Sequence, residues 1–261
     1  TPSRKELNLL DYNLVNDFLK INKPDYIIMA AAKVGGIYAN NNFGADFIFD
    51  NTQIQNNVIH AAHIEDINNL LFLGSSCVYP KHSDQPIKEE YLLTGPLEPT
   101  NEAYAIAKIS GIKLCENYNL QYKTNYKCLM PCNSYGPNDN YDLKNSHFIA
   151  ALIKKIYLAK KYKRKQIEIW GTGKPKREII FVDDIADACI YFMNKKTKKS
   201  LINIGTGKDL SIEEYAKYLI KFFNLNLKIK KNLNMPDGIK RKLLNVSLAN
   251  SLGWKAQTSL K

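Results

Sequence analysis

Two short stretches of the sequence carry side chains that could do carbonyl chemistry. Residues 71–80 are predicted to begin as a buried strand that ends near Ser75, with the thiol of Cys77 two positions later. Further on, Tyr104 and Lys108 are four positions apart and therefore share one face of a helix. A ketone held between the strand end and that helix face could contact all four side chains. The pattern predicts a carbonyl-chemistry site.

A phenol beside an ammonium group suits the reduction of a ketone. Negative charge develops on the ketone oxygen, so a proton donor must be in place. The ordinary pKa of tyrosine is about 10, and we expect Lys108 to lower the pKa of Tyr104 by favouring the phenolate. Ser75 would supply a second hydrogen bond. The Tyr-x-x-x-Lys spacing recurs at 157–161 and 191–195, but neither copy follows a Gly-Ser-Ser strand end, and both are predicted to be surface pairs.

The elements that must position these side chains alternate along the first half of the chain. Apolar spacing predicts helices at 7–22, with Asp11 as the N-cap, and at 46–63 and 103–119. Strands are predicted at 26–32, which is expected to be fully buried, and at 70–74 and 126–131. This alternation indicates an α/β fold, a Rossmann-type doubly wound parallel sheet covered on both faces.

The second half is less regular. It is predicted to contain a turn-rich loop at 132–140, helices at 146–160 and 183–194, short strands at 167–170 and 201–204, a capping box at 211–214, and a less regular end from 227. We therefore expect a nucleotide-binding region at 1–136. Residues 137–261 are expected to form mostly a smaller substrate-binding lobe, with some segments that return to the main sheet.

One expected motif is absent. A dinucleotide-binding sheet opens with a strand, a glycine-rich turn and a helix, and no G-x-x-G-x-x-G precedes the first predicted helix. The remaining pattern leads us to expect that the first strand and helix of the fold are missing from this sequence. The alternative is a scaffold or interaction protein that kept the fold without binding nucleotide.

Composition excludes several classes of protein. The formal charge of +12 comes mostly from scattered lysines, whereas nucleic-acid binders concentrate arginines and aromatic residues on one face, so we predict no nucleic-acid partner. No apolar run approaches the roughly 18 to 20 residues of a membrane span, which predicts a soluble, cytoplasmic protein with no membrane partner. The five cysteines lack metal-type spacing, so reduced thiols and no metal site are expected.

Several sequence blocks carry a family resemblance. They include Ala-Ala-Ala-Lys-Val-Gly-Gly at 30–36, Gly-Ser-Ser-Cys-Val-Tyr-Pro at 74–80, and further blocks at 6–11, 97–108, 145–147, 170–173, 177–178, 236–238 and 241–244. With these blocks the chain resembles the extended short-chain dehydrogenase/reductases, and within them the GDP-L-fucose synthase family, over essentially its whole length. The resemblance implies NADPH-dependent 3,5-epimerisation and 4-reduction of GDP-4-keto-6-deoxy-mannose.

The resemblance also implies a role for individual residues. Ser75, Tyr104 and Lys108 match the family's reductase triad, and Cys77 and His147 match its epimerisation pair. The residues expected to contact NADPH or NADP are Arg4, Ser75, Tyr104, Lys108, Pro131, Cys132, Asn133, Ser134 and His147. The GDP-sugar is expected to contact Lys155, Trp170, Arg177 and Asp237. A homodimer through the helices at 46–63 and 103–119 is also implied.

Two points leave alternatives open. Lys155 stands where the bacterial family pattern usually has arginine, which keeps the charge but loses a two-pronged hydrogen bond to a diphosphate. A relative that makes another GDP-deoxysugar, such as GDP-L-colitose, would share the reductase triad, so the exact product stays open at this point.

Overall fold

The computed structural model describes residues 1–143, 146–235 and 237–260. Its main sheet contains four parallel strands. In spatial order they are β1 (Ile27–Met29), β2 (Asn69–Leu73), β3 (Asn125–Pro131) and β7 (Leu201–Ile204). Because all of these strands run in one direction, their carboxyl ends lie along one edge, where open α/β sheets bind their ligands. The predicted α/β fold with a parallel sheet is confirmed.

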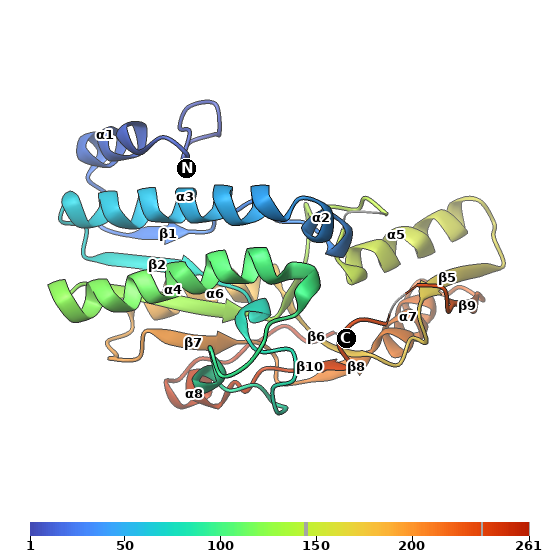
Figure 1. Ribbon diagram of the computed structural model, residues 1–261. Coiled ribbons are helices and arrows are strands. Elements are labelled where there is room, and N and C mark those ends of the chain that lie inside the picture. Colours follow the sequence, from blue (N-terminus) through green and yellow to red (C-terminus); the bar gives the residue numbers. More distant parts are fainter. Residues whose placement is uncertain (144–145, 236, 261) are drawn as a thin grey trace.

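Helices cover both faces of the main sheet. Figure 1 shows α3 and α4 side by side in front of the strands and α6 behind them. In chain order, the helices of this part are α1 (Tyr12–Asn22), α2 (Ile37–Asn42), α3 (Gly44–Ile64), α4 (Glu102–Tyr122), α6 (Val182–Asn194) and α8 (Ser247–Ser251). Short 3₁₀ turns occupy Ser76–Val78, Glu89–Tyr91 and Pro99–Asn101. The centre of β2 is fully buried between these layers, since Leu70, Leu71 and Phe72 are each 0% exposed.

A smaller lobe lies beside the carboxyl edge of the main sheet, at the right of Figure 1. It contains a second sheet in which β6 is parallel to β4 and β10 and antiparallel to β8, and a separate parallel pair of β5 and β9. The lobe's elements are β4 (Asn133–Tyr135), α5 (Phe148–Lys161), β5 (Gln166–Trp170), β6 (Lys176–Phe181), β8 (Asp209–Ser211), α7 (Ile212–Phe222), β9 (Lys228–Asn232) and β10 (Arg241–Lys242). A second apolar core fills it. The predicted boundary at 136 stays a prediction.

Two helices start at the capping residues that the sequence predicted. The carboxylate of Asp11 accepts hydrogen bonds from the backbone N–H groups of Asn13 and Leu14, at 2.9 and 3.3 Å, so it caps α1 as predicted. Ser211 and Glu214 form the predicted capping box at the start of α7. The helix predicted from residue 7 begins only at Tyr12, where the cap allows it.

One predicted strand differs from the structure, and two regions predicted to lack strands contain one. The strand predicted over 26–32 is limited to Ile27–Met29 and is not fully buried, because β1 lies at the edge of the described sheet and leaves Ile28 41% exposed. The loop predicted over 132–140 contains β4, which forms because β6 pairs with it. The region from 227, expected to be irregular, contains β9, which pairs with β5 in parallel.

Two features of the described residues bear on the classes considered above. Within the ranges given, no helix is both long and apolar enough to cross a bilayer. The same ranges contain no group of three or more His, Cys, Asp or Glu side chains placed to bind a metal ion. The five cysteines are all buried free thiols.

Candidate active site

The ammonium group of Lys108 reaches from α4 to the carboxyl end of β2. Its Nζ donates a hydrogen bond to the carbonyl oxygen of Leu73 at 2.8 Å and lies 4.5 Å from the centre of the Phe72 ring. Lys108 is 3% exposed, and no carboxylate in the described part of the chain forms a salt bridge with it. Burial lowers the pKa of Lys108 to about 8. The strand end and the helix face meet as predicted.

Tyr104 stands one turn before Lys108, with its ring edge-on to Phe47 at 6.3 Å. Lys108 Nζ lies 5.9 Å from the centre of the Tyr104 ring. Burial raises the pKa of Tyr104, and nearby Cys77 raises it further. The expected lowering of this pKa by Lys108 is therefore wrong for the protein alone, because loss of water around the phenol outweighs the attraction of an ammonium that is itself directed at Leu73.

Ser75 and Cys77 lie just beyond β2, in a tight turn rather than on a continued strand. Ser75 caps the 3₁₀ turn Ser76–Val78, and its Oγ accepts a hydrogen bond from the Cys77 backbone N–H at 3.4 Å. The two residues therefore do not continue β2, because the chain turns as soon as it leaves the sheet. Burial raises the pKa of the Cys77 thiol, against the positive charge of Lys242, the Ser75 hydroxyl and the charge of Lys108.

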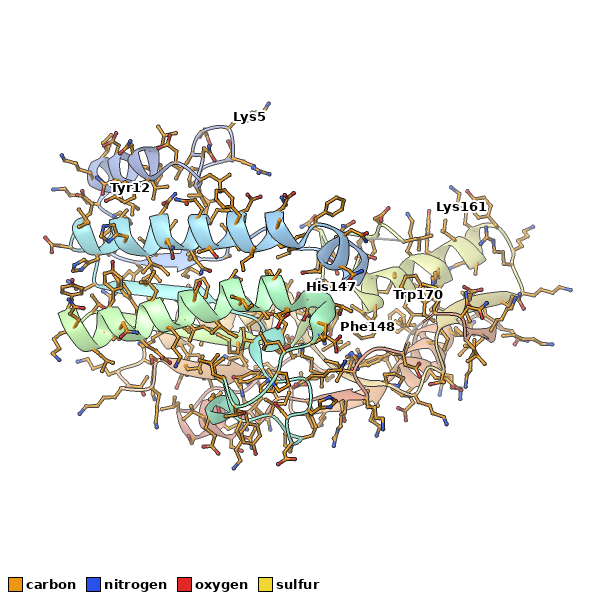
Figure 2. All side chains as sticks on the ribbon, in the orientation of Figure 1. Lys5, Tyr12, His147, Phe148, Lys161 and Trp170 are labelled. Carbon is orange, nitrogen blue, oxygen red and sulfur yellow. The ribbon has the colours of Figure 1, made fainter. Side chains whose placement is uncertain are left out.

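His147 is the N-cap residue of α5 and approaches from the small lobe, as labelled in Figure 2. Burial lowers the pKa of its imidazole. The negative charge of Asp139 opposes this shift, and the positive charge of Lys242 adds to it. The imidazole is therefore biased towards its neutral form. Asn145, which precedes it in the predicted motif, lies outside the described residues, as does Pro236.

Lys242 is a residue of this site to which the sequence patterns gave no role. It lies on β10, and its charge bears on Cys77, Cys132 and His147. Burial lowers the pKa of Lys242. The signal that could have found it is the Arg-Lys-Leu-Leu block at 241–244, which contributed to the resemblance but was left without a function.

The residues after β3 follow the same edge of the sheet. Pro131 ends β3 opposite Ile204, and buried Cys132 donates its backbone N–H to the Ile204 carbonyl at 3.1 Å. Asn133 uses its side-chain amide to hold the Glu178 carbonyl at 2.9 Å, and Ser134 is exposed on β4. This segment is therefore beside the Ser75 turn, where a ligand of the sheet edge would pass.

Arg4, an expected cofactor contact, lies in a turn and not at the end of a strand. Residues 4–6 form a turn, held by hydrogen bonds from the backbone N–H groups of Glu6 and Leu7 to the Ser3 carbonyl at 3.0 Å, and Arg4 is exposed. The reason is that no described strand pairs with residues 1–6. The structure does not bring Arg4 together with the other candidates.

The predicted nucleotide contacts form two pairs in the small lobe. On α5, Lys155 donates its Nζ to the Glu168 carbonyl at 2.9 Å and lies 5.7 Å from the centre of the Trp170 ring. Trp170 ends β5 and is 41% exposed (Figure 2). A cation over one part of an accessible indole leaves aromatic surface for stacking a planar base.

The second pair is Arg177 with Asp237. Arg177 donates from Nη1 to the Ile239 carbonyl at 2.6 Å, and the neighbouring charge of Asp237 partly offsets the lowering of its pKa by burial. Asp237 accepts hydrogen bonds from the backbone N–H and the hydroxyl of Thr172, at 2.6 and 2.8 Å. Gly171 has a φ of +62° and a Cβ there would lie 2.1 Å from Asp237 Oδ1, so the turn after Trp170 requires glycine.

Free hydrogen-bonding capacity shows whether these residues suit a hydroxyl-rich cofactor and sugar. Lys108 has three N–H donors and uses one on Leu73 in the described structure. Within the same described ranges the buried atoms Asn101 Oδ1 and Ser146 Oγ have no hydrogen-bond partner. A buried polar atom without a partner is costly. These donors and acceptors fit a ligand that carries ribose and sugar hydroxyls.

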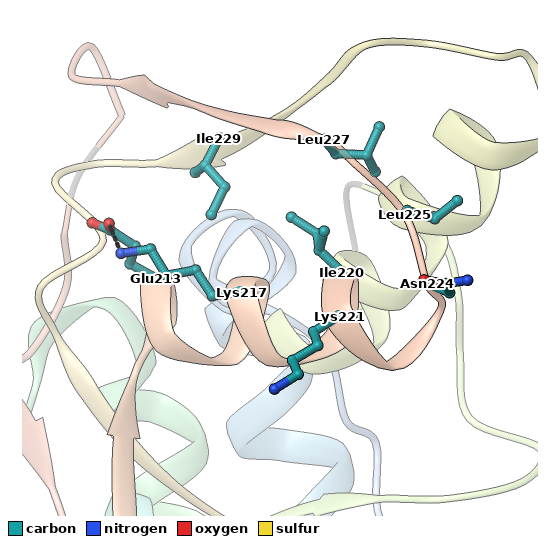
Figure 3. A pocket seen from close by; sticks show the side chains of 8 residues that line it. All are labelled: Glu213, Lys217, Ile220, Lys221, Asn224, Leu225, Leu227 and Ile229. Carbon is teal, nitrogen blue, oxygen red and sulfur yellow. Dashed lines mark ion pairs between the residues drawn. The ribbon is translucent and has the colours of Figure 1, made fainter.

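A surface groove of about 530 Å³ lies away from this site, between α7 and β9 (Figure 3). Apolar side chains form its floor and charged ones its rim, including the Glu213–Lys217 ion pair at 2.7 Å. Its lining residues are Glu213, Lys217, Ile220, Lys221, Asn224, Leu225, Leu227 and Ile229. None of the candidate residues lines it, so the chemistry points to the sheet edge instead.

Comparison with known proteins gives a consistent set of relatives. The model of the NAD dependent epimerase/dehydratase family matches residues 2–205. The chain is 48% identical to a GDP-L-fucose synthase of Escherichia coli, covering 99% of this chain and 84% of that one. It is 43% identical to a GDP-L-colitose synthase of Yersinia pseudotuberculosis, covering 100% of this chain and 85% of that one.

Solved structures agree with these relatives. The fold matches MlghC, a GDP-mannoheptose C4 reductase from Campylobacter jejuni with NADP bound, with a TM-score of 0.90 and 38% identity over 99% of this chain and 85% of that one. Sequence, fold and the arrangement at the sheet edge lead to the same assignment. The chain belongs to the NAD dependent epimerase/dehydratase family, and within it to the group of the GDP-L-fucose synthases.

Proposed function

We propose that this chain converts GDP-4-keto-6-deoxy-mannose to GDP-L-fucose by 3,5-epimerisation and NADPH-dependent 4-reduction. The observation that carries the proposal is the meeting of Tyr104, Lys108 and Cys77 at the carboxyl end of β2, where Lys108 is fixed on Leu73. The 48% identity to the Escherichia coli GDP-L-fucose synthase supports the choice of substrate.

In the reductive half, Tyr104 is the proton donor to the C4 oxygen. Its raised pKa keeps the phenol protonated before the reaction, and negative charge that develops on the ketone oxygen draws the proton across. The Ser75 hydroxyl gives the second hydrogen bond to that oxygen. Lys108, which holds an ammonium within reach of the phenol, stabilises the phenolate that remains.

In the epimerising half, Cys77 and His147 exchange protons with the sugar carbons next to the ketone. The ketone acidifies the C–H bonds at C3 and C5, so a base can remove the proton from one face while an acid returns one to the other. The two groups come from different elements, Cys77 from the turn after β2 and His147 from the start of α5. Both have ordinary pKa values within reach of neutrality.

NADPH, when bound, supplies the hydride that reduces C4. The residues that would hold it are Lys108 and Tyr104, the segment 131–134 after β3, and Ser75 and His147 at the reacting end; Arg4 would contact the 2′-phosphate. The unused N–H donors of Lys108 support this assignment.

The small lobe would hold the GDP group. Trp170 offers an accessible indole for ring contact, and Arg177 and Lys155 offer positive charge for the diphosphate. Asp237, already oriented by Thr172, is the acceptor for ribose or base donors.

Product analysis in deuterated water tests the proposal. With NADPH and GDP-4-keto-6-deoxy-mannose, the full-length protein should give GDP-L-fucose that carries deuterium at C3 and C5. A reduced sugar without epimerisation would refute the epimerase half, and labelled but unreduced sugar would refute the reductase half.

A second candidate function is the synthesis of a related GDP-deoxysugar, favoured by the 43% identity to GDP-L-colitose synthase. That reaction needs inversion at C5 alone, so it predicts deuterium at C5 and none at C3. The same experiment therefore separates the two candidates.

We also propose a homodimer through α3 and α4. Phe49 on α3 and Ile106 on α4 are 67% and 43% exposed, and exposed apolar side chains on adjacent helices suit a protein interface. Sedimentation should give a dimer, and Phe49→Lys should give a monomer; an unchanged mass would count against this surface.

A further inference from the structure

A buried carboxylate lies between the two lobes, and the mechanism above does not use it. Glu178 on β6 is 0% exposed. Its Oε1 accepts a hydrogen bond from the Gly207 backbone N–H at 2.6 Å, and its Oε2 accepts one from the Leu244 backbone N–H at 2.9 Å. Within the ranges that the structure describes, no lysine, arginine or histidine forms a salt bridge with it. A charge buried in this way is costly, which calls for a reason for its presence.

The surroundings of Glu178 are shaped to receive this carboxylate. The Thr206 hydroxyl lies 3.5 Å from Oε1, so three donors converge on the two oxygens. A Cβ on Gly205 would lie 2.3 Å from Oε1, so any larger residue there would displace the carboxylate. Burial raises the pKa of Glu178 to about 7, and the hydrogen bonds from Leu244, Gly207 and Thr206 oppose that rise.

The hydrogen bonds join three segments that are far apart in the sequence. Gly207 follows β7, the last strand of the main sheet, and Leu244 follows β10 in the small lobe. Glu178 itself is on β6, which pairs with β10 so that Lys242 lies opposite Arg177. One carboxylate thus connects the main sheet to the two strands that carry the cations Arg177 and Lys242.

We propose that Glu178 is a positioning residue for the sugar-nucleotide site, holding β6 and the segment after β10 against the end of β7 so that Arg177 stays beside Asp237 and Lys242 stays beside Cys77. The identity of the ligand rests on the function proposed above. Side chains alternate along a strand, so the side chains of Glu178 and Arg177 point to opposite faces of β6. Glu178 therefore acts on Arg177 through the backbone of the strand. The Arg177 guanidinium is in turn fixed by the Ile239 carbonyl at 2.6 Å.

The chemistry of the donors requires a carboxylate rather than an amide. Both backbone groups are N–H donors, and a carboxylate has two acceptor oxygens. In Glu178→Gln, one oxygen is replaced by an NH₂ group, which must face Gly207 or Leu244 donor to donor. One of the two connections is then lost while the size of the side chain is kept.

The experiment measures GDP binding by calorimetry for the wild type, Glu178→Gln and Glu178→Asp, together with kcat and KM for the keto sugar. The matched control is Glu116→Gln, on α4 in an ion pair with Lys113 and away from the site. Displacement of Arg177 should remove one charge-assisted hydrogen bond to the diphosphate, which corresponds to roughly 10-fold in affinity. We expect Glu178→Gln to weaken GDP binding and raise KM by about 10-fold, with kcat changed by less than about 3-fold.

Glu178→Asp keeps the charge but is too short to serve Gly207 and Leu244 at once, so it should weaken GDP binding in the same direction, and it decides the question if the glutamine variant does not fold. Wild-type GDP affinity in a folded variant, with only a lower melting temperature, would overturn the proposal. Because GDP binding is read without turnover, a wild type that binds GDP but does not convert the keto sugar would refute the proposed function and leave the effect of Glu178 measurable.

Discussion

The carboxyl edge of the main sheet and the nucleotide side of the small lobe are built in different ways. At the sheet edge, Ser75 comes from the turn after β2 and Tyr104 and Lys108 come from α4, and β2 and α4 are consecutive large elements of the chain. In the small lobe, Lys155, Trp170, Arg177 and Asp237 come from α5, β5, β6 and the segment before β10, and their strands pair with partners far away in the sequence. The first site needs local folding, and the second needs a completed lobe.

The two regions also differ in their contact with water. Lys108 is 3% exposed while Trp170 is 41% exposed, so the ammonium group at the sheet edge is shielded from water and the indole ring of the lobe is accessible to it. A buried group that must gain or lose a proton suits chemistry, and an accessible ring suits binding. The division predicts that substitutions at the sheet edge change kcat and that those in the lobe change KM.

The largest effect expected is that of Tyr104→Phe. Removal of the proton donor should lower kcat for reduction by roughly 10²- to 10⁴-fold, followed by NADPH oxidation at saturating sugar nucleotide. KM for the sugar nucleotide should hardly change, because the lobe is intact. The control is Tyr157→Phe, a tyrosine with the same spacing to lysine that is 54% exposed on α5; it should behave as the wild type. Reduction at more than a tenth of the wild-type rate in Tyr104→Phe would contradict the assignment of the proton donor to the sheet edge.

Cys77→Ser should separate the two reactions within the sheet edge. A hydroxyl has almost no acidity near neutrality, so deuterium incorporation at C3 and C5 should fall by about 10²-fold or more, while reduction continues and yields a sugar that keeps the D configuration. Cys189→Ser, at a buried position of α6, is the control for loss of a thiol. Equal loss of labelling in both variants would mean that the effect is one of packing.

A smaller effect should follow from pH. Since the pKa of Lys108 is about 8, its ammonium is lost as the pH rises through that value, and the reduction rate should fall by up to about 10-fold per pH unit above it. Arg177 stays charged throughout, so GDP affinity should not follow. In Lys108→Arg the residual rate should lack this alkaline fall; if it keeps the fall, another group titrates.

The lowered pKa of Lys108 also affects stability, and here the effect of rising pH is an increase, whereas the reduction rate falls. The folded chain loses the Lys108 proton at a lower pH than the unfolded chain does, so between about 8 and the ordinary lysine pKa of about 10.4 the unfolded state binds more protons. The free energy of unfolding should therefore rise with pH across this window in the wild type relative to Lys108→Met, measured by urea denaturation.

The contrast between the regions also explains what the sequence could predict. Asp11 and the Ser211–Glu214 box mark helix starts through contacts within three positions, and both were read correctly. Strand β6 was not predicted because its first half, Lys176 to Glu178, is charged, and its pairing comes from β4, β8 and β10. Strand β9 was missed for the same reason, since its lysines disfavour a strand until β5 provides a partner.

The features of the site that the sequence could not predict have a similar origin. The Tyr104 and Lys108 pair could be found from spacing, but the direction of the Tyr104 pKa could not, because burial depends on how α3 and α4 pack. Lys242 reaches the Cys77 turn only because β10 pairs with β6. The block at 241–244 marks this residue, but the position of its side chain depends on the completed second sheet, which no local pattern encodes.

The smallest effect concerns Lys155, where a substitution should strengthen nucleotide binding rather than weaken it. Lys155→Arg offers a planar group with two parallel donors for a diphosphate, so GDP should bind about 2- to 5-fold more tightly, with kcat unchanged, by calorimetry and initial rates. Lys154→Arg is the matched control, since Lys154 Nζ lies 5.8 Å from the Tyr157 ring, away from Trp170. Weaker binding in Lys155→Arg alone would show that the hydrogen bond to the Glu168 carbonyl, 2.9 Å long, matters more than the charge, because an arginine cannot keep that contact and also turn its fork towards the ligand.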